Sequence, residues 1–136
     1  MHPESPDAVT IRGGAKFLQK HKLIRSYYWT TDVSIINNYL INYGPVVVGT
    51  YFTEGMTPLE QETALAYGTG DKIASYAYVI DSVNTNLGRY RIRLHFGNDW
   101  GRDGLAYVPI DDIAELLQDE GEACLPVGFG KKWKPT

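Results

Sequence analysis

Residues 89–96 alternate strictly between apolar and basic side chains. The apolar positions are Tyr90, Ile92, Leu94 and Phe96, and the basic ones are Arg89, Arg91, Arg93 and His95. A period of two over this length is typical of a β-strand with one buried face and one solvated face. Because such a strand usually belongs to an antiparallel sheet, this segment predicts a sheet that is covered on one side.

The other segments predict the partners of that strand. We expect strands at 24–29, 46–52, 72–83, 105–110 and 123–127, of which 46–52, a β-branched run, should be buried on both faces. Helical spacing of apolar residues predicts helices at 11–22, 33–43 and 112–120. The fold class is therefore α+β: a twisted, mostly antiparallel sheet or half-barrel with two or three packed helices.

Short signals set the expected helix ends. Asp32 is a typical N-cap, and Gly44 with the following proline should end the helix that it opens. Asp112 and Glu115 have the spacing of an acidic capping box for the last helix, which Gly121 should end. Residues 53–71 show no clear periodicity, and a loop of this length is more often functional or mobile than neutral.

Composition limits the classes that remain. With 136 residues and 43% hydrophobic content, the chain is expected to form one domain, 9–127, between arms at 1–8 and 128–136. A net charge of −3 argues against nucleic acid as the primary partner. One cysteine excludes an internal disulfide. Without a signal segment or a membrane-spanning run, we expect synthesis in a cytoplasm and no membrane partner; the final location, a virion included, stays open.

Four motifs carry a family resemblance. Residues 94–104 read L-H-F-G-N-D-W-G-R-D-G and resemble the N-S-W-G-x-x-W-G-x-x-G loop of papain-like cysteine peptidases. Residues 75–81, S-Y-A-Y-V-I-D, are similar to the family's G-H-A-Y-V-L-D strand, and 44–49 match its G-P-V-x-V opening. Residues 119–126 resemble the end of a bacterial and bacteriophage subgroup. The resemblance spans 11–127 and implies the right-domain type fold, the portion that follows the catalytic cysteine helix.

The resemblance also shows where the chain departs from the family. Tyr76 stands at the position of the catalytic histidine and Leu94 at that of the orienting asparagine, and the cysteine-bearing segment lies outside the match. A thiol peptidase needs a cysteine, a base and a group that orients the base. We therefore expect no catalytic residues, only the vestigial positions Tyr76 and Leu94, and no cofactor. Cys124 lies among apolar residues and is expected to be a small buried hydrophobe.

The remaining titratable groups predict no metal or acid–base site. His2 and His95 are scattered, and no usual metal-ligand spacing is present. His95 belongs to the solvated face of its strand. The acidic pairs at 111–112 and 119–120 are better interpreted as helix-terminal charges than as catalytic carboxylates.

Two groups are candidates for interactions. Arg89, Arg91 and Arg93 form one row, which is either a solvated sheet face held by nearby acidic side chains or an interface stripe. Lys131, Lys132 and Trp133 lie at the tip of the C-terminal arm and suit docking on another protein.

The function that these observations favour is a catalytically inactive papain-like pseudo-peptidase used as a structural or binding module. Its expected partners are proteins, in a homo-oligomer or a larger assembly such as a bacteriophage virion. Two alternatives stay open. A separate chain could supply the cysteine helix of a split peptidase. Alternatively, the chain could be a peptide-binding or inhibitory module that uses the remnant cleft beside Tyr76.

Overall fold

The fold is taken from a computed structural model, which describes residues 26–57, 63–94, 102 and 104–127. The order of elements along the chain is β1 (Ser26–Thr30), α2 (Val33–Asn42), β2 (Val46–Thr53), a 3₁₀ turn (Glu54–Met56), β3 (Lys72–Asn84), β4 (Arg89–Arg93), β5 (Leu105–Pro109), α3 (Ile110–Gln118) and β6 (Glu122–Val127). The strands predicted from the sequence are all present among these residues. The helix predicted at 11–22 and both arms lie outside them.

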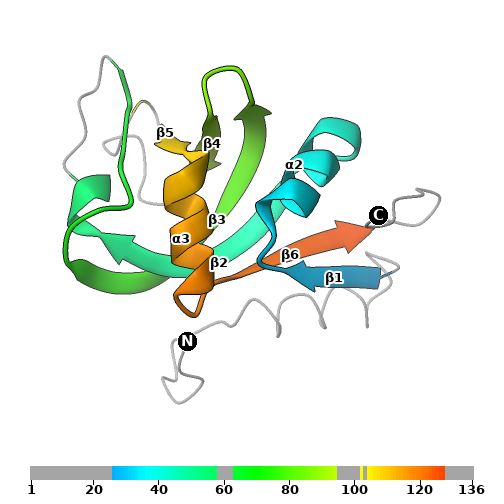
Figure 1. The fold of residues 1–136 in the computed structure, drawn as a ribbon, viewed down its shortest axis with the longest axis horizontal. Coiled ribbons are helices and arrows are strands. Elements are labelled where there is room, and N and C mark those ends of the chain that lie inside the picture. Colours follow the sequence, from blue (N-terminus) through cyan, green and yellow to red (C-terminus); the bar gives the residue numbers. More distant parts are fainter. Residues whose placement is uncertain (1–25, 58–62, 95–101, 103, 128–136) are drawn as a thin grey trace.

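The strands form one antiparallel sheet in the order β1-β6-β2-β3-β4-β5 (Figure 1). The last strand, β6, inserts between β1 and β2, so the sheet joins the early and late parts of the chain. β2 and β3 pair over nearly their whole lengths, from Val46 opposite Ile80 to Phe52 opposite Ala74. The predicted α+β class, with a twisted antiparallel sheet, is confirmed.

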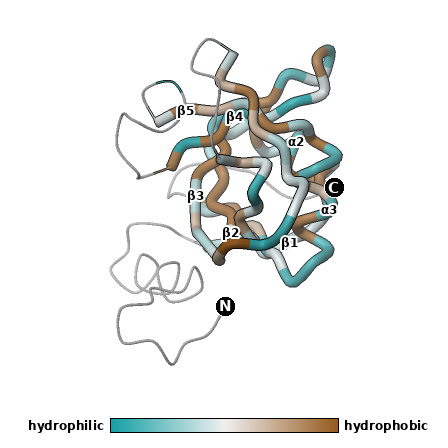
Figure 2. The backbone as a smooth tube through the Cα atoms, turned by 90° about the vertical axis from the view of Figure 1, so that its left-hand side faces the viewer, coloured by the Kyte–Doolittle hydropathy of each residue, from teal (hydrophilic) through white to brown (hydrophobic). Residues whose placement is uncertain are grey.

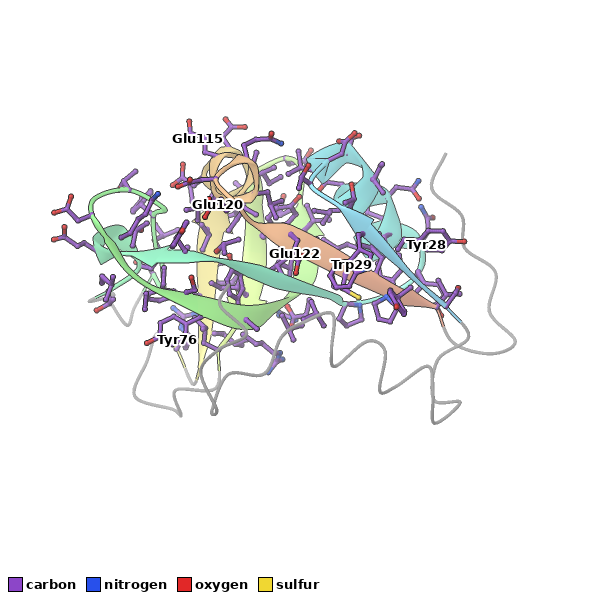
Figure 3. The ribbon with its side chains drawn as sticks, turned by 90° about the horizontal axis from the view of Figure 1, so that it is seen from below. Tyr28, Trp29, Tyr76, Glu115, Glu120 and Glu122 are labelled. Atoms are coloured by element: carbon purple, nitrogen blue, oxygen red, sulfur yellow. The ribbon has the colours of Figure 1, made fainter. Side chains whose placement is uncertain are left out.

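Both helices cover the same face of the sheet (Figures 1 and 3). The hydrophobic stretches of the chain follow the strands (Figure 2), and their inward side chains meet α2 and α3 in one core. The largest fully buried side chains of this core are Ile36, Tyr39, Val46, Val48, Met56, Ile80, Tyr90, Ile92, Val108, Ile113, Leu117 and Leu125. Neither helix in the described part of the chain is long and apolar enough to cross a membrane.

The alternation in β4 is confirmed. Tyr90 and Ile92 are fully buried, whereas Arg91 is half-buried and Arg93 is exposed. The prediction that β2 is buried on both faces is wrong in part, because Val47 and Tyr51 are only half-buried. The helices cover just one face of the sheet, so alternate residues of the central strand remain partly accessible on the other.

Helix α2 begins as predicted. The Asp32 carboxylate accepts a hydrogen bond from the Ser34 backbone N–H at 2.8 Å, which satisfies one of the free donors of the first turn. The Ser34 hydroxyl donates to the same carboxylate at 2.7 Å, and this side-chain hydrogen bond, followed by the backbone one, lowers the pKa of Asp32 below its ordinary value. The Tyr39 hydroxyl donates to the Pro126 carbonyl, so the helix is tied to β6.

The prediction for the start of α3 is wrong. The helix begins at Ile110, directly after the N-cap residue Pro109, and no side chain caps it. Pro109 lacks an N–H and has a fixed φ, which suits an abrupt change from strand to helix. Asp112 therefore lies within the first turn, where its carboxylate accepts from the Gly68 N–H at 2.9 Å. The acidic residue is a helix-terminal charge, but it is not a capping box.

The end of α3 also differs from the prediction. The helix ends at Gln118, and Glu120, not Gly121, takes the left-handed conformation, with φ of 63°. Gly121 is needed for another reason. A Cβ there would lie 2.7 Å from the Leu116 carbonyl oxygen and 2.8 Å from the Leu117 Cα, closer than real Cβ atoms come. The turn into β6 therefore passes against the backbone of the helix.

The segment between β2 and β3 packs along the edge of the sheet. The Gly55 N–H donates to the Thr69 carbonyl at 2.8 Å, so the two ends of the segment pair with each other. Further along, the Ala66 N–H donates to the Tyr107 carbonyl at 2.9 Å, and the Tyr107 N–H donates to the Ala64 carbonyl at 2.8 Å. These bonds occupy the outer edge of β5, where an unpaired strand would be open to other chains.

We expect Gly121→Ala to lower the free energy of unfolding by ~1–3 kcal/mol, because the added methyl group must displace backbone atoms of α3. Gly44→Ala is the matched control, since no atom lies within 4 Å of the Cβ that it would add. Its effect should stay within ~0.5 kcal/mol. Urea denaturation of both variants measures the difference, and equal stabilities would contradict the close approach at Gly121.

Candidate functional site

Tyr76 lies on β3, directly opposite Thr50 of β2. It is half-buried and packs against the main core, with its ring edge-on to Phe52 at a centroid distance of 5.4 Å and an interplanar angle of 89°. In Figure 3, Tyr76 lies toward the opposite end of the sheet from Tyr28 and Trp29. The Tyr76 ring therefore packs against the core from its edge.

Leu94 directly follows β4 and is 7% exposed, within the same core cluster that Tyr76 contacts. The preceding residue, Arg93, pairs with Val79 of β3, so Leu94 lies beside the strand that carries Tyr76. Its backbone N–H donates to the Gly104 carbonyl at 3.2 Å. The sequence prediction that Leu94 is a core residue is confirmed. Leu94 and Tyr76 thus contact the same apolar cluster.

The side chains of Tyr76 and Leu94 differ in their chemistry from the histidine and asparagine of the motifs that the sequence resembles. A phenol hydroxyl is a poor proton acceptor at neutral pH, and an aliphatic side chain can neither accept nor donate a hydrogen bond. On the same strand, the Tyr78 hydroxyl hydrogen-bonds to Thr50 Oγ1 at 2.8 Å, and burial raises the pKa of Tyr78 above its ordinary value. The buried tyrosine stays neutral and holds the core together.

Cys124 lies on the opposite face of the sheet from Tyr76. On β2, Val47 faces Cys124 and Thr50 faces Tyr76. Residues three apart on a strand point to opposite faces, so the thiol and the tyrosine are separated by the sheet itself. Cys124 is 3% exposed and packs in a small cluster whose other members are Tyr27, Trp29, Val47 and Ala77. The expectation of a buried, hydrophobic cysteine is confirmed.

The arginine row is organised by an acidic residue of β3. The Asp81 carboxylate accepts from Arg91 Nε at 2.7 Å and from Arg93 Nε at 2.5 Å. Burial of Asp81 acts to raise its pKa, but the hydrogen bonds and charges of the two arginines outweigh this effect, so the pKa is lowered. The same contact with Asp81 is the main reason why the pKa of Arg91 is raised. The interpretation that nearby acidic side chains hold the row is therefore correct for these two arginines.

Arg89 differs from the other two arginines, because the described residues offer it no ion pair. Its guanidinium lies 5.5 Å from the centroid of the Tyr107 ring on β5. Beside it is a pocket of about 310 Å³, lined by Thr63, Ser82, Asn84, Leu87, Arg89, Arg91 and Tyr107. The pocket lies on the face of the sheet away from the helices. Two arginines with neutral polar neighbours make it suited to an anionic group.

Sequence reasoning missed Asp81 and the pocket. A signal was nevertheless present: Ser82 lies near the end of the strand predicted at 72–83, Asn84 follows two residues later, and the short turn there makes a hairpin with the arginine strand. In such a hairpin, polar residues at alternate positions face each other across the strands. Thr63 and Tyr107 could not be added in this way, because they come from segments whose placement depends on the whole sheet.

The other candidate residues do not converge on a site. Asp111 lies in the first turn of α3, as expected of a helix-terminal charge. At the other end, Asp119 pairs with Lys72 at 2.6 Å, and Glu120 accepts from the Tyr51 hydroxyl at 2.8 Å. Among the described residues, no group of three histidine, cysteine or acidic side chains could hold a metal ion. The candidates that lie outside the described residues are His2, His95, Lys131, Lys132 and Trp133.

Comparison with solved structures identifies the fold as papain-like. Xylellain, a cysteine protease from Xylella fastidiosa, superposes with a TM-score of 0.60 and 17% identity over 77% of this chain and 40% of its own. The proform of the ragweed pollen cysteine protease Amb a 11 gives 0.58 and 16%, over 79% and 35%. Digestive procathepsin L 3 from Tenebrio molitor larval midgut gives 0.53 and 12%, over 76% and 35%. No family model and no curated protein sequence matches.

These similarities show the fold alone, because each is well below the identity at which function is shared. The sheet and helices match the right-domain type α+β fold of the three proteases. The chain spans 40% or less of the length of each. The predicted resemblance to papain-like peptidases is therefore confirmed for the fold.

We expect Leu94→Asn, which restores the family's residue, to lower the free energy of unfolding by ~2–4 kcal/mol. The substitution removes apolar burial and places an amide in an apolar cluster. Ile41→Asn is the control, because Ile41 is 65% exposed on α2 and should lose no more than ~1 kcal/mol. Thermal and urea unfolding measure both, and an unchanged stability for Leu94→Asn would contradict its place in the core.

Asp81→Asn should lower the free energy of unfolding at pH 7 by about 1.5–3 kcal/mol, since two charged hydrogen bonds are lost. The pKa of Asp81 is lowered by folding, so its contribution is fully present above the ordinary aspartate pKa of ~4 and is lost as the pH falls through the folded value. The difference in stability between the two proteins should therefore begin to shrink near pH ~4 and disappear below the folded pKa of Asp81. Urea titrations from pH 7 to acid measure this, with the exposed Asp111→Asn as control. A gap that does not change with pH would contradict the role of Asp81.

Proposed function

We propose that this papain-like domain works without peptidase activity, as a binding or structural module. The observation that carries the proposal is the packing at the histidine and asparagine positions, where Leu94 is buried in the apolar core and the half-buried Tyr76 packs against it. Thiol catalysis needs a base beside the nucleophile and a polar group that orients the base. In this chain, the side chains at both positions stabilise the sheet.

The pattern of replacement supports loss of catalysis over a change in specificity. An enzyme that changes its substrate keeps the groups that form and break bonds, whereas here both supporting groups are unsuited to proton transfer. The remaining thiol, Cys124, does not compensate, because the sheet separates it from Tyr76. The same two positions disfavour a split peptidase, since a cysteine supplied by another chain would still lack its base.

A binding role is supported by the face of the sheet that the helices leave uncovered. It carries three arginines, of which one has no ion pair with a described residue, and a pocket. Such a surface suits contact with acidic groups of a protein partner. We include in the proposal that the partner belongs to an ordered assembly, either of copies of this chain or of the larger kind found in a virion.

The purified protein should hydrolyse neither peptides nor esters of the kind that papain-like enzymes cleave, and iodoacetamide should label Cys124 slowly. The thiol is 3% exposed and must wait for local opening. Protein unfolded in guanidinium provides the control, because there the same thiol should react fast. Rapid labelling of the folded protein together with turnover that disappears in Cys124→Ser would overturn the proposal.

A further inference from the structure

The pocket on the arginine face has walls from three strands and one loop. Ser82 and Asn84 of β3 face Arg91 and Arg89 of β4, and Tyr107 of β5 lies on the other side of Arg91. Thr63 closes the pocket from the loop that runs beside β5. A volume of about 310 Å³ is at the lower end of the range for small-ligand sites, so the pocket suits a small group and not a whole cofactor.

The charge of the pocket is one-sided. Among the described residues, its lining holds two guanidinium groups, Arg89 and Arg91, and no acidic side chain. Asp81, the carboxylate that holds the row, contacts Arg91 and Arg93 through their Nε atoms and is not part of the lining. A guanidinium has further N–H donors on its terminal nitrogens, which remain able to donate to another acceptor.

The two arginines are held in place by different contacts. Asp81 fixes Arg91 at 2.7 Å, and the Arg89 guanidinium lies over the Tyr107 ring at 5.5 Å. Side chains that are already positioned lose less conformational entropy when a ligand binds. The row itself favours an anion, because like charges on neighbouring positions of one strand repel until something acidic lies between them.

We propose that this pocket binds an oxyanion, a carboxylate or a phosphate, between Arg89 and Arg91. Planar guanidinium groups match both anions with paired hydrogen bonds. Leu87, 61% exposed, lies in the lining and offers an apolar contact next to the charged one. A carboxylate attached to an apolar residue, as at the C-terminus or on a side chain of a protein partner, fits this combination better than free phosphate. The inference rests on the proposed binding role and names its site.

Titration of the full ¹⁵N-labelled chain at constant ionic strength tests the site with three probes: N-acetyl-leucine, which carries a free carboxylate, its neutral amide N-acetyl-leucinamide, and inorganic phosphate. We expect saturable shifts at the amides of Arg89, Arg91 and Leu87 with N-acetyl-leucine, and none with the amide. Arg89→Gln should weaken binding at least about tenfold, because it removes one charged donor pair. Arg93→Gln is the matched control, since Arg93 belongs to the same row but does not line the pocket; it should change the affinity less than about threefold, by screened charge alone.

Each outcome decides the inference. Phosphate that saturates the same amides more tightly than N-acetyl-leucine supports an oxyanion site and assigns its source to free phosphate. Equal binding of the neutral amide, an unchanged affinity in Arg89→Gln, or no saturation with either anion overturns it. Thermal unfolding of Arg89→Gln shows whether the fold is kept, and Asn84→Ala, a smaller change at the exposed rim, gives a second test if it is not. The peptidase assay is independent, so failure of this site and failure of the inactive-module proposal are distinguishable.

Discussion

The two-faced character of β4 is the constraint on which the structure depends. Tyr90 and Ile92 are fully buried on one face, and each contributes roughly 1.5–3 kcal/mol through burial of apolar surface. A shift of one residue would place the arginines in the core, where an unpaired charge costs far more than these residues contribute. The alternation therefore fixes which face of β4 is buried. It places the arginine row on the face that the helices leave uncovered.

The position of the arginine row in turn explains why a carboxylate, Asp81, lies beside it. A row of guanidinium groups along one strand is unfavourable unless a carboxylate lies within reach, and β3 supplies one that contacts both Arg91 and Arg93. A bulge in the pairing between Ile80 and Ser82 lies at this carboxylate. Bulges redirect a side chain within a ladder, so the irregularity and the ion pairs belong to one local arrangement. Arg89 lies two residues before Arg91 on β4, beside the Tyr107 ring and in the lining of the pocket.

Much of the fold could be predicted because it depends on local patterns. Alternation over a few residues predicts the strands and the burial of Leu94, and the chemistry of a single residue predicts the N-cap at Asp32. The two ends of α3 could not be predicted in this way. The helix starts at a proline junction, and it ends where Gly121 must pass the helix backbone, a distance that only the folded chain defines. At such junctions, several short sequence signals for a helix end lie close together, and the tertiary contacts determine which residue ends the helix.

The candidate site likewise has one part that the sequence predicts and one part that it does not. The difference of Tyr76 and Leu94 from the histidine and asparagine of the resembled motifs is a matter of residue identity, so it can be seen in the sequence. The pocket depends on which strands are neighbours: its lining joins Ser82, Arg89 and Tyr107 from three strands. Sequence analysis weighed a solvated arginine face against an interface stripe. In the structure the three arginines differ in their contacts: Asp81 holds two of them, and the third lies over the Tyr107 ring beside the pocket.

The packing of Tyr76 and Leu94, the positions that the resemblance aligns with the family's histidine and asparagine, bears on the stability of the sheet. A catalytic histidine and its asparagine are polar groups held near a cleft, and groups of this kind commonly reduce stability in exchange for activity. In this chain, a tyrosine that packs on Phe52 and a leucine that is 7% exposed supply apolar contacts to the core instead. Both side chains contact one cluster, so a polar residue at position 94 would face apolar neighbours. These contacts stabilise the papain-like sheet, and the binding role that we propose belongs to the face that the helices leave uncovered.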